Sequence, residues 1–143
     1  MEFNVSSAEL LKGLSDVARA IPAKSPISIL ENFLFAIKDD KLEITASDQE
    51  LTLRTILNVD VKEEGSMAVP AHQMMDLIKA LPDQPVSFKT TSDSSFECTW
   101  ANGNSSLPFF PAEDYPEIKG AGEDADTVVL PAQALIDGIN GTI

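Results

Sequence analysis

The residue types that most often carry chemistry are scarce in this 143-residue chain and do not cluster. His72 is the only histidine and Cys98 the only cysteine, so neither has a second imidazole or thiol with which to build a zinc-type site. Cys98 falls between Phe96 and Trp100 on the apolar side of an expected strand, which predicts a core thiol rather than a nucleophile. The chain has no phosphate-cradling glycine loop, nucleophile elbow or paired-carboxylate site. We therefore expect no catalysis, no metal and no cofactor.

Basic side chains, in contrast, share the polar faces of two expected helices. Lys12 and Arg19 lie seven residues apart, two turns along one face of the first helix. On the second helix His72, Asp76 and Lys79 share the face opposite the apolar positions. By spacing alone, both faces are interpreted as solvated helix surfaces.

These helices belong to a pattern of one strand, one helix and three strands that occurs twice. Period-two alternation of apolar residues marks the strands as antiparallel, with one face on a core. The expected elements are a strand at 2–6, a helix at 7–19, strands at about 33–37, 42–46 and 51–61, then a strand at 66–69, a helix at 71–81 and three strands between 86 and 110. The sequence predicts an α+β fold with two βαβββ units, whose two helices cover one face of a curved antiparallel sheet.

An internal repeat supports this organisation and extends it. Similar sequence segments occupy residues 4–14, 68–78 and 129–139, and their first residues are 64 and then 61 positions apart. A fixed period indicates one supersecondary unit used repeatedly. The third copy follows an acidic connector and has almost no chain after it. We expect a domain at residues 1–122 and, at 123–143, the opening strand and helix of a second, truncated domain, so that the chain is an N-terminal piece of a longer protein.

Composition limits the class of protein and its partners. The chain is 43% hydrophobic and 23% charged, which is ordinary for a globular domain with a core. Its formal charge of −13 argues against wrapping nucleic acid by bulk attraction, because phosphate binding needs a basic footprint. The start of the chain lacks a signal sequence, and a single cysteine suits a reducing compartment, so we expect a cytoplasmic protein.

Several segments, in order, resemble one family, that of the bacterial sliding clamp, which is the beta subunit of DNA polymerase III. The segments are the opening at 1–12, the element with Pro26, Ile29, Leu30 and Asn32, the strand from Leu42 to Asp48, the start of the second unit at Val69, Pro70 and Ala71, and the element from Phe110 to Pro116. The resemblance covers the whole chain.

The resemblance implies a DNA clamp fold and a processivity factor without chemistry of its own. In that family a ring-shaped dimer encircles duplex DNA, is placed there by a clamp loader and tethers the replicative polymerase, with helices lining the hole. It implies DNA-facing positions at Lys12, Arg19, Lys24, His72, Gln73 and Lys79. It implies a subunit interface at Asn102, Asn104, Ser105 and Leu107.

The interface strand departs from the family pattern, because small polar residues stand where larger or basic ones are common. A partner surface would also belong to a domain that these 143 residues do not include, so we expect this piece to be mainly monomeric. The alternative is a stand-alone ligand- or protein-binding module that uses the exposed sheet edge near residues 102–110. An enzyme dependent on His72 is a more distant third hypothesis.

Overall fold

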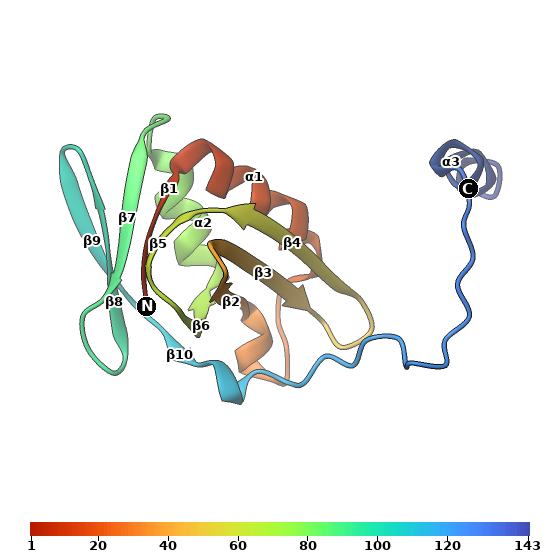
Figure 1. Ribbon diagram of the computed structural model, residues 1–143, viewed down its shortest axis with the longest axis horizontal. Helices are drawn as coiled ribbons and strands as arrows, with labels where there is room; N and C mark the ends of the chain where they lie inside the picture. Colours follow the sequence, from red (N-terminus) through yellow and green to blue (C-terminus); the bar gives the residue numbers. More distant parts are fainter.

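The computed structural model describes all residues from 1 to 143 and contains two five-stranded antiparallel sheets with helices packed against them (Figure 1). Its elements are β1 (Glu2–Ser6), α1 (Ser7–Val17), η1 (Ala18–Ala20), η2 (Ser28–Glu31), β2 (Asn32–Lys38), β3 (Lys41–Ser47), β4 (Thr52–Asn58), β5 (Asp60–Glu63), β6 (Gly65–Pro70), α2 (Ala71–Ala80), β7 (Pro85–Thr90), β8 (Ser95–Trp100), β9 (Gly103–Pro108), β10 (Phe110–Pro111), η3 (Ala112–Asp114) and α3 (Ala132–Asn140). The predicted α+β class and the order of the two βαβββ units are confirmed. No helix is long and apolar enough to cross a membrane.

The strands that the sequence assigned to a curved antiparallel sheet are divided between two sheets. One sheet has the order β5-β1-β7-β8-β9 and the other β10-β6-β2-β3-β4. The first strand of each unit therefore joins the sheet made by the last three strands of the other unit, since β1 pairs with β7 and β6 pairs with β2. Alternation of apolar residues marks the faces of a strand but not its partner, so the sequence did not reveal this exchange.

The expected long strand at 51–61 is divided between the two sheets. β4 pairs with β3 in one sheet, and β5 pairs with β1 in the other. Val59 lies between β4 and β5; it is buried, and its backbone N–H donates to the Asp40 carbonyl at 3.1 Å. The chain thus crosses from sheet to sheet at Val59 without losing the apolar alternation that had suggested one strand.

Both sheets and both helices share one core. Phe3 on β1 stacks on Phe88 of β7 with ring centroids 4.9 Å apart, and Phe88 contacts Phe96 on β8. In α1 the buried residues recur at helical spacing and include Leu10 and Leu14, both fully buried. Burial of this apolar surface is the main stabilising contribution.

Polar contacts join the start of α1 to the end of α2. Ser6 is the N-cap of α1, as its Oγ accepts from the Glu9 N–H and donates to an Asp83 carboxylate oxygen at 3.0 Å. Ser7, the first residue of α1, bridges the two units. Its hydroxyl donates to the Pro82 carbonyl at 2.9 Å and accepts from the Gln84 N–H at 3.0 Å. The two helices consequently lie side by side, and their buried faces point into the same core (Figure 1).

The C-terminal segment leaves the body of the domain. Ile118 still packs against the small cluster of Leu30, Ala68 and Tyr115, whereas every residue from 119 to 143 is exposed. Residues 116–131 have no helix or strand, and α3 lies apart at their end (Figure 1). The helix of the third repeat copy is present, but the strand expected before it is not formed, because no other strand lies beside it to supply hydrogen-bond partners.

Replacing Leu14 by Ala should lower the free energy of unfolding by about 2–5 kcal/mol, since it removes a fully buried side chain and leaves a cavity. The matched control is Leu51→Ala at a half-exposed position, for which we expect about 1 kcal/mol or less. Urea denaturation followed by circular dichroism measures both. Equal losses for the two variants would contradict the assigned core.

Limited digestion with a glutamate-specific protease should cut first after Glu117 or Glu123, because both are exposed in the long segment 116–131, which has no helix or strand. Mass spectrometry should then find a resistant fragment that begins at Met1 and ends near the predicted boundary at residue 122. Early cleavage between residues 1 and 110 would contradict a domain with this boundary.

Candidate nucleic-acid interface

The exposed residues of α1, η1 and α2 form one continuous surface, here called the helix surface. On α1 and η1 they are Ala8, Glu9, Lys12, Ser15, Asp16 and Arg19, and on α2 they are His72, Gln73, Asp76, Lys79 and Ala80. Because neighbouring helices bury their opposite faces in the same core, these residues lie on the same side of the domain. The structure thus brings together five of the six predicted DNA-facing residues.

The sixth, Lys24, lies in the segment between η1 and η2 and is exposed. This segment is held by its own polar contacts. The Ser25 N–H donates to a Glu31 carboxylate oxygen at 3.2 Å, and the Ile27 N–H donates to Ser25 Oγ at 3.1 Å. Arg19, expected at the end of a helix reaching residue 19, lies instead in the 3-10 helix η1, which directly follows α1.

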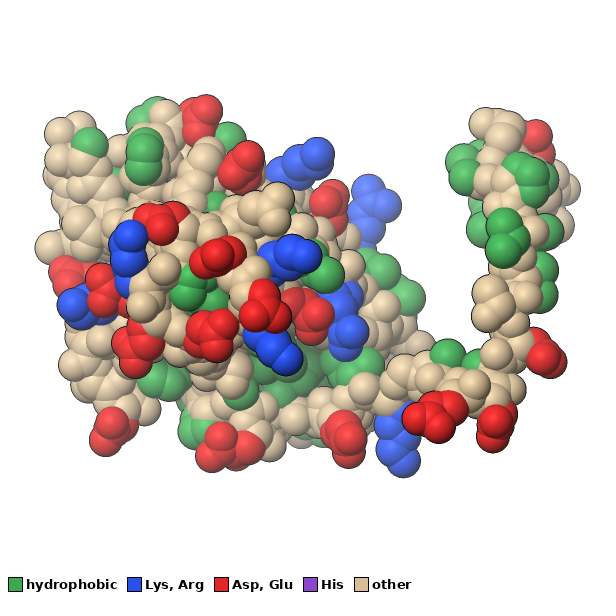
Figure 2. Space-filling view, in the orientation of Figure 1, with side chains coloured by type: hydrophobic (Ala, Val, Ile, Leu, Met, Phe, Trp, Pro, Cys, Tyr) green, Lys and Arg blue, Asp and Glu red, His purple; other side chains and the backbone are tan.

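Basic and acidic side chains alternate on the helix surface. Lys12 and Arg19 balance Glu9 and Asp16, and Lys79 balances Asp76, so α1, η1 and α2 together carry no net formal charge. The other seven basic and twenty acidic residues carry the entire formal charge of −13. On the side of the molecule drawn in Figure 2, where His72 is not visible, Lys and Arg are also interspersed with Asp and Glu, and carboxylates are concentrated on the C-terminal segment.

His72 is fully exposed and has one close polar partner. Its Nδ1 lies 4.0 Å from a carboxylate oxygen of Asp76, one turn along α2. No group of three or more histidine, cysteine, aspartate or glutamate side chains is arranged to hold a metal ion. His72 and Gln73 therefore contribute polar, hydrogen-bonding groups to the helix surface.

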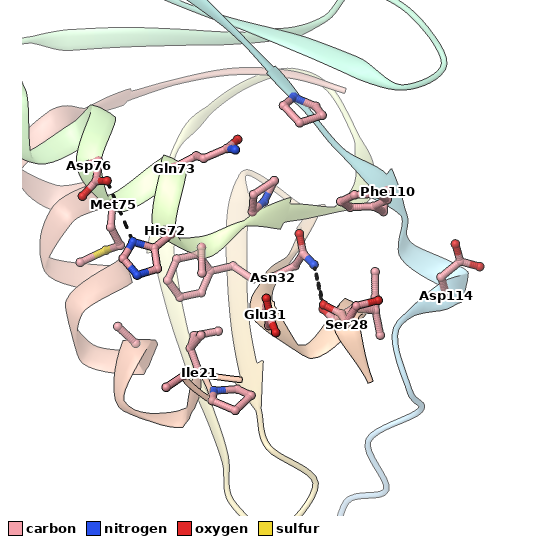
Figure 3. A pocket seen from close by; sticks show the side chains of 18 of the residues that line it. Ile21, Ser28, Glu31, Asn32, His72, Gln73, Met75, Asp76, Phe110 and Asp114 are labelled. Carbon is pink, nitrogen blue, oxygen red and sulfur yellow. Dashed lines mark hydrogen bonds and ion pairs between the residues drawn. The ribbon is translucent and has the colours of Figure 1, made fainter. Parts of the chain in front are cut away.

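An open groove of about 870 Å³ lies beside the start of α2 and was not predicted from the sequence (Figure 3). His72, Gln73 and Lys79 line it from α2, and Phe110 and Asp114 lie across from them. Its walls come from distant parts of the chain, which is why local patterns could not reveal it.

Asn32 shows how the wall of this groove is built. It is buried, and its Nδ2 donates to the backbone carbonyls of Ser28 at 3.4 Å and Ile29 at 3.0 Å. These bonds close the short helix η2 against the start of β2 (Figure 3). Asn32 was identified from the resemblance, and its contacts give it a positioning role in the fold.

The predicted interface residues lie on or beside β9, a strand with a free edge. β9 pairs only with β8, so one side of its backbone is unpaired. Leu107 and Ser105 are partly buried, whereas Asn104 is exposed. Asn102 is not part of the strand, because the hairpin turn is formed by Ala101 and Asn102 and β9 begins at Gly103.

Comparisons with known proteins point to one family. The model of the family described as "DNA polymerase III beta subunit, N-terminal domain" matches residues 1–119. The beta sliding clamp of Vibrio cholerae is 28% identical over 120 residues, which are 83% of this chain and 33% of that protein. The beta sliding clamp of Streptomyces coelicolor is 28% identical over 130 residues, 90% of this chain and 34% of that protein.

Solved structures agree with these relatives. The pol III beta structure from Caulobacter crescentus has a TM-score of 0.81 and 26% identity, covering 85% of this chain and 34% of that one. A sliding clamp structure from Pseudomonas aeruginosa bound to griselimycin has a TM-score of 0.80 and 26% identity, covering 87% of this chain and 34% of that one. The chain thus spans about a third of the length of these relatives.

Burial raises the pKa of the Cys98 thiol to about 12, so the thiol is neutral and shielded in the folded protein. We expect a disulfide-exchange reagent at about pH 8 to label Cys98 only after the chain is unfolded in denaturant, since a free cysteine has a pKa of about 8.5. Absorbance of the released thiolate measures the rate. Labelling of the native protein as fast as that of the unfolded protein would contradict a buried, unreactive thiol.

Proposed function

Because the chain belongs to the family of the DNA polymerase III beta subunit, we propose that it is the N-terminal domain, at residues 1–122, and the start of a second domain of a sliding clamp. In the complete subunit this domain forms part of a ring that encircles duplex DNA and tethers the replicative polymerase in the cytoplasm. The protein is a non-catalytic processivity factor that a clamp loader places on DNA. The match over residues 1–119 is the observation that carries this proposal.

The distribution of charge supports the orientation of the domain in the ring. The helix surface has no net charge, whereas the rest of the domain is strongly acidic. Duplex DNA is repelled least by the helix surface, so electrostatics favour DNA inside a ring lined by helices. Lys12, Arg19, Lys24, His72, Gln73 and Lys79 are the proposed DNA-facing residues.

Holding DNA by closure of a ring removes the need for tight phosphate contacts. Strong backbone binding would depend steeply on salt and would oppose sliding. A ring whose helix surface is neutral can instead remain on DNA because it is closed and still move along it. This reconciles a chain of formal charge −13 with a role on DNA.

The free edge of β9 is the proposed contact with the next subunit. Its unpaired backbone groups can extend the sheet into a partner strand, and Leu107 supplies an apolar contact. The same edge is the basis of the alternative function, a binding module that takes an extended peptide. The two functions differ in whether DNA is retained topologically.

The test is retention of the full-length gene product that contains these residues, after loading, on nicked circular DNA and on the same DNA linearised. At high salt we expect retention on circles and loss from linear ends, because a closed ring can leave only over an end. Gel filtration separates free protein from protein bound to DNA.

Equal binding to both DNA forms that fades with salt would instead indicate ordinary electrostatic attachment. Absence of binding to either form, with loading shown to be competent, would favour the binding module. Either result would overturn the clamp proposal.

A further inference from the structure

We propose that the carboxylates of Asp16 and Asp76 offset the positive charge of the neighbouring basic residues and so prevent the helix surface from binding the DNA backbone tightly. The inference rests on the proposed function and assigns a role to two residues that sequence analysis did not place in contact with DNA. Each carboxylate lies within one helical turn of a cation on the same surface. Asp16 lies between Lys12 and Arg19, and Asp76 precedes Lys79.

Local helix stability does not account for Asp16. It is the penultimate residue of α1, at the end where the helix dipole disfavours negative charge. It makes no ion pair, and Lys12 precedes it by four residues, the less favourable order for such a pair. Glu9 differs, because it lies in the first turn, where the dipole favours a carboxylate, and its backbone N–H bonds the N-cap Ser6.

Asp76 also leaves the cation beside it free. Its close polar partner is His72 Nδ1 at 4.0 Å, and Lys79 has no carboxylate within ion-pair distance. Asp76 is exposed at the middle of α2 and does not cap the helix. Asp16 therefore has no packing, capping or pairing role, and Asp76 pairs only with the exposed His72 and not with the neighbouring Lys79.

The two carboxylates change the electrostatic field locally, on the helix surface. A phosphate that approaches Lys12, Arg19 or Lys79 also meets a carboxylate at similar distance, so attraction and repulsion nearly cancel. Removal of both carboxylates leaves three cations unopposed except by Glu9. The helix surface would then bind the DNA backbone weakly, and this binding would slow the diffusion of a ring along DNA.

The experiment compares the 143-residue chain with its Asp16→Asn/Asp76→Asn variant, using anisotropy of a labelled short linear duplex at several salt concentrations. The matched control is Glu50→Gln/Asp93→Asn, which removes the same number of negative charges at exposed positions away from α1 and α2. At low salt the helix variant should bind about three- to tenfold tighter than the control. The slope of its log affinity against log salt concentration should also be steeper than that of the control by roughly two to three, because Lys12, Arg19 and Lys79 displace counterions from the DNA phosphates.

Equal affinities and salt slopes for the two variants would overturn the inference, because the effect would then be one of total charge. Strong salt-dependent binding by the unsubstituted chain would overturn it as well. Neither result depends on ring closure, which the comparison of circular and linear DNA tests separately. In loaded full-length protein, the helix variant should remain on circles and diffuse more slowly along DNA than the control.

Discussion

The reciprocal exchange of first strands is the constraint on which the rest of the domain depends. β1 completes the sheet of the second unit and β6 completes the sheet of the first, so neither βαβββ unit has a complete sheet of its own. Each exchanged strand leads directly into a helix, which fixes α1 and α2 beside one another over a common core. The bridge from Ser7 to Pro82 and Gln84 reinforces this arrangement at one end of the helices.

This arrangement divides the domain into surfaces with different electrostatic properties. The helix surface has alternating charges that cancel, and the sheets and connectors carry the acidic excess. This division requires that α1 and α2 expose their polar faces on the same side of the domain. The exchange of strands therefore links the internal repeat of the sequence to the proposed DNA-facing side of the domain.

Much of the fold could be predicted because short sequence patterns determine its helices and strands. Proline residues and capping serines mark helix boundaries, and alternation marks strands. Asp39 and Asp40 form the turn between β2 and β3, and both have the positive φ angles, 51° and 57°, of a tight hairpin turn. Strand partners were not predicted, because the pairing of β1 with β7 and the crossing at Val59 depend on tertiary contacts.

The candidate site divides along the same line. Helical spacing placed Lys12 and Arg19 on one side of the first helix, and the exposed surface contains both. The groove beside His72 and Gln73 was missed because Phe110 and Asp114 reach it from a segment far away in sequence. Asp16 was missed for a different reason. Its position at the end of α1 and its lack of an ion-pair partner are known only from the structure.

The most direct test of the account is photocrosslinking to DNA from single introduced cysteines in loaded full-length protein. Buried Cys98 should remain unlabelled, so Ser15→Cys on α1 and Thr99→Cys on the outside of β8, both exposed, can carry the probe. We expect efficient crosslinks from position 15 and few from position 99. Equal yields, or a higher yield from position 99, would contradict a ring in which the helix surface faces DNA.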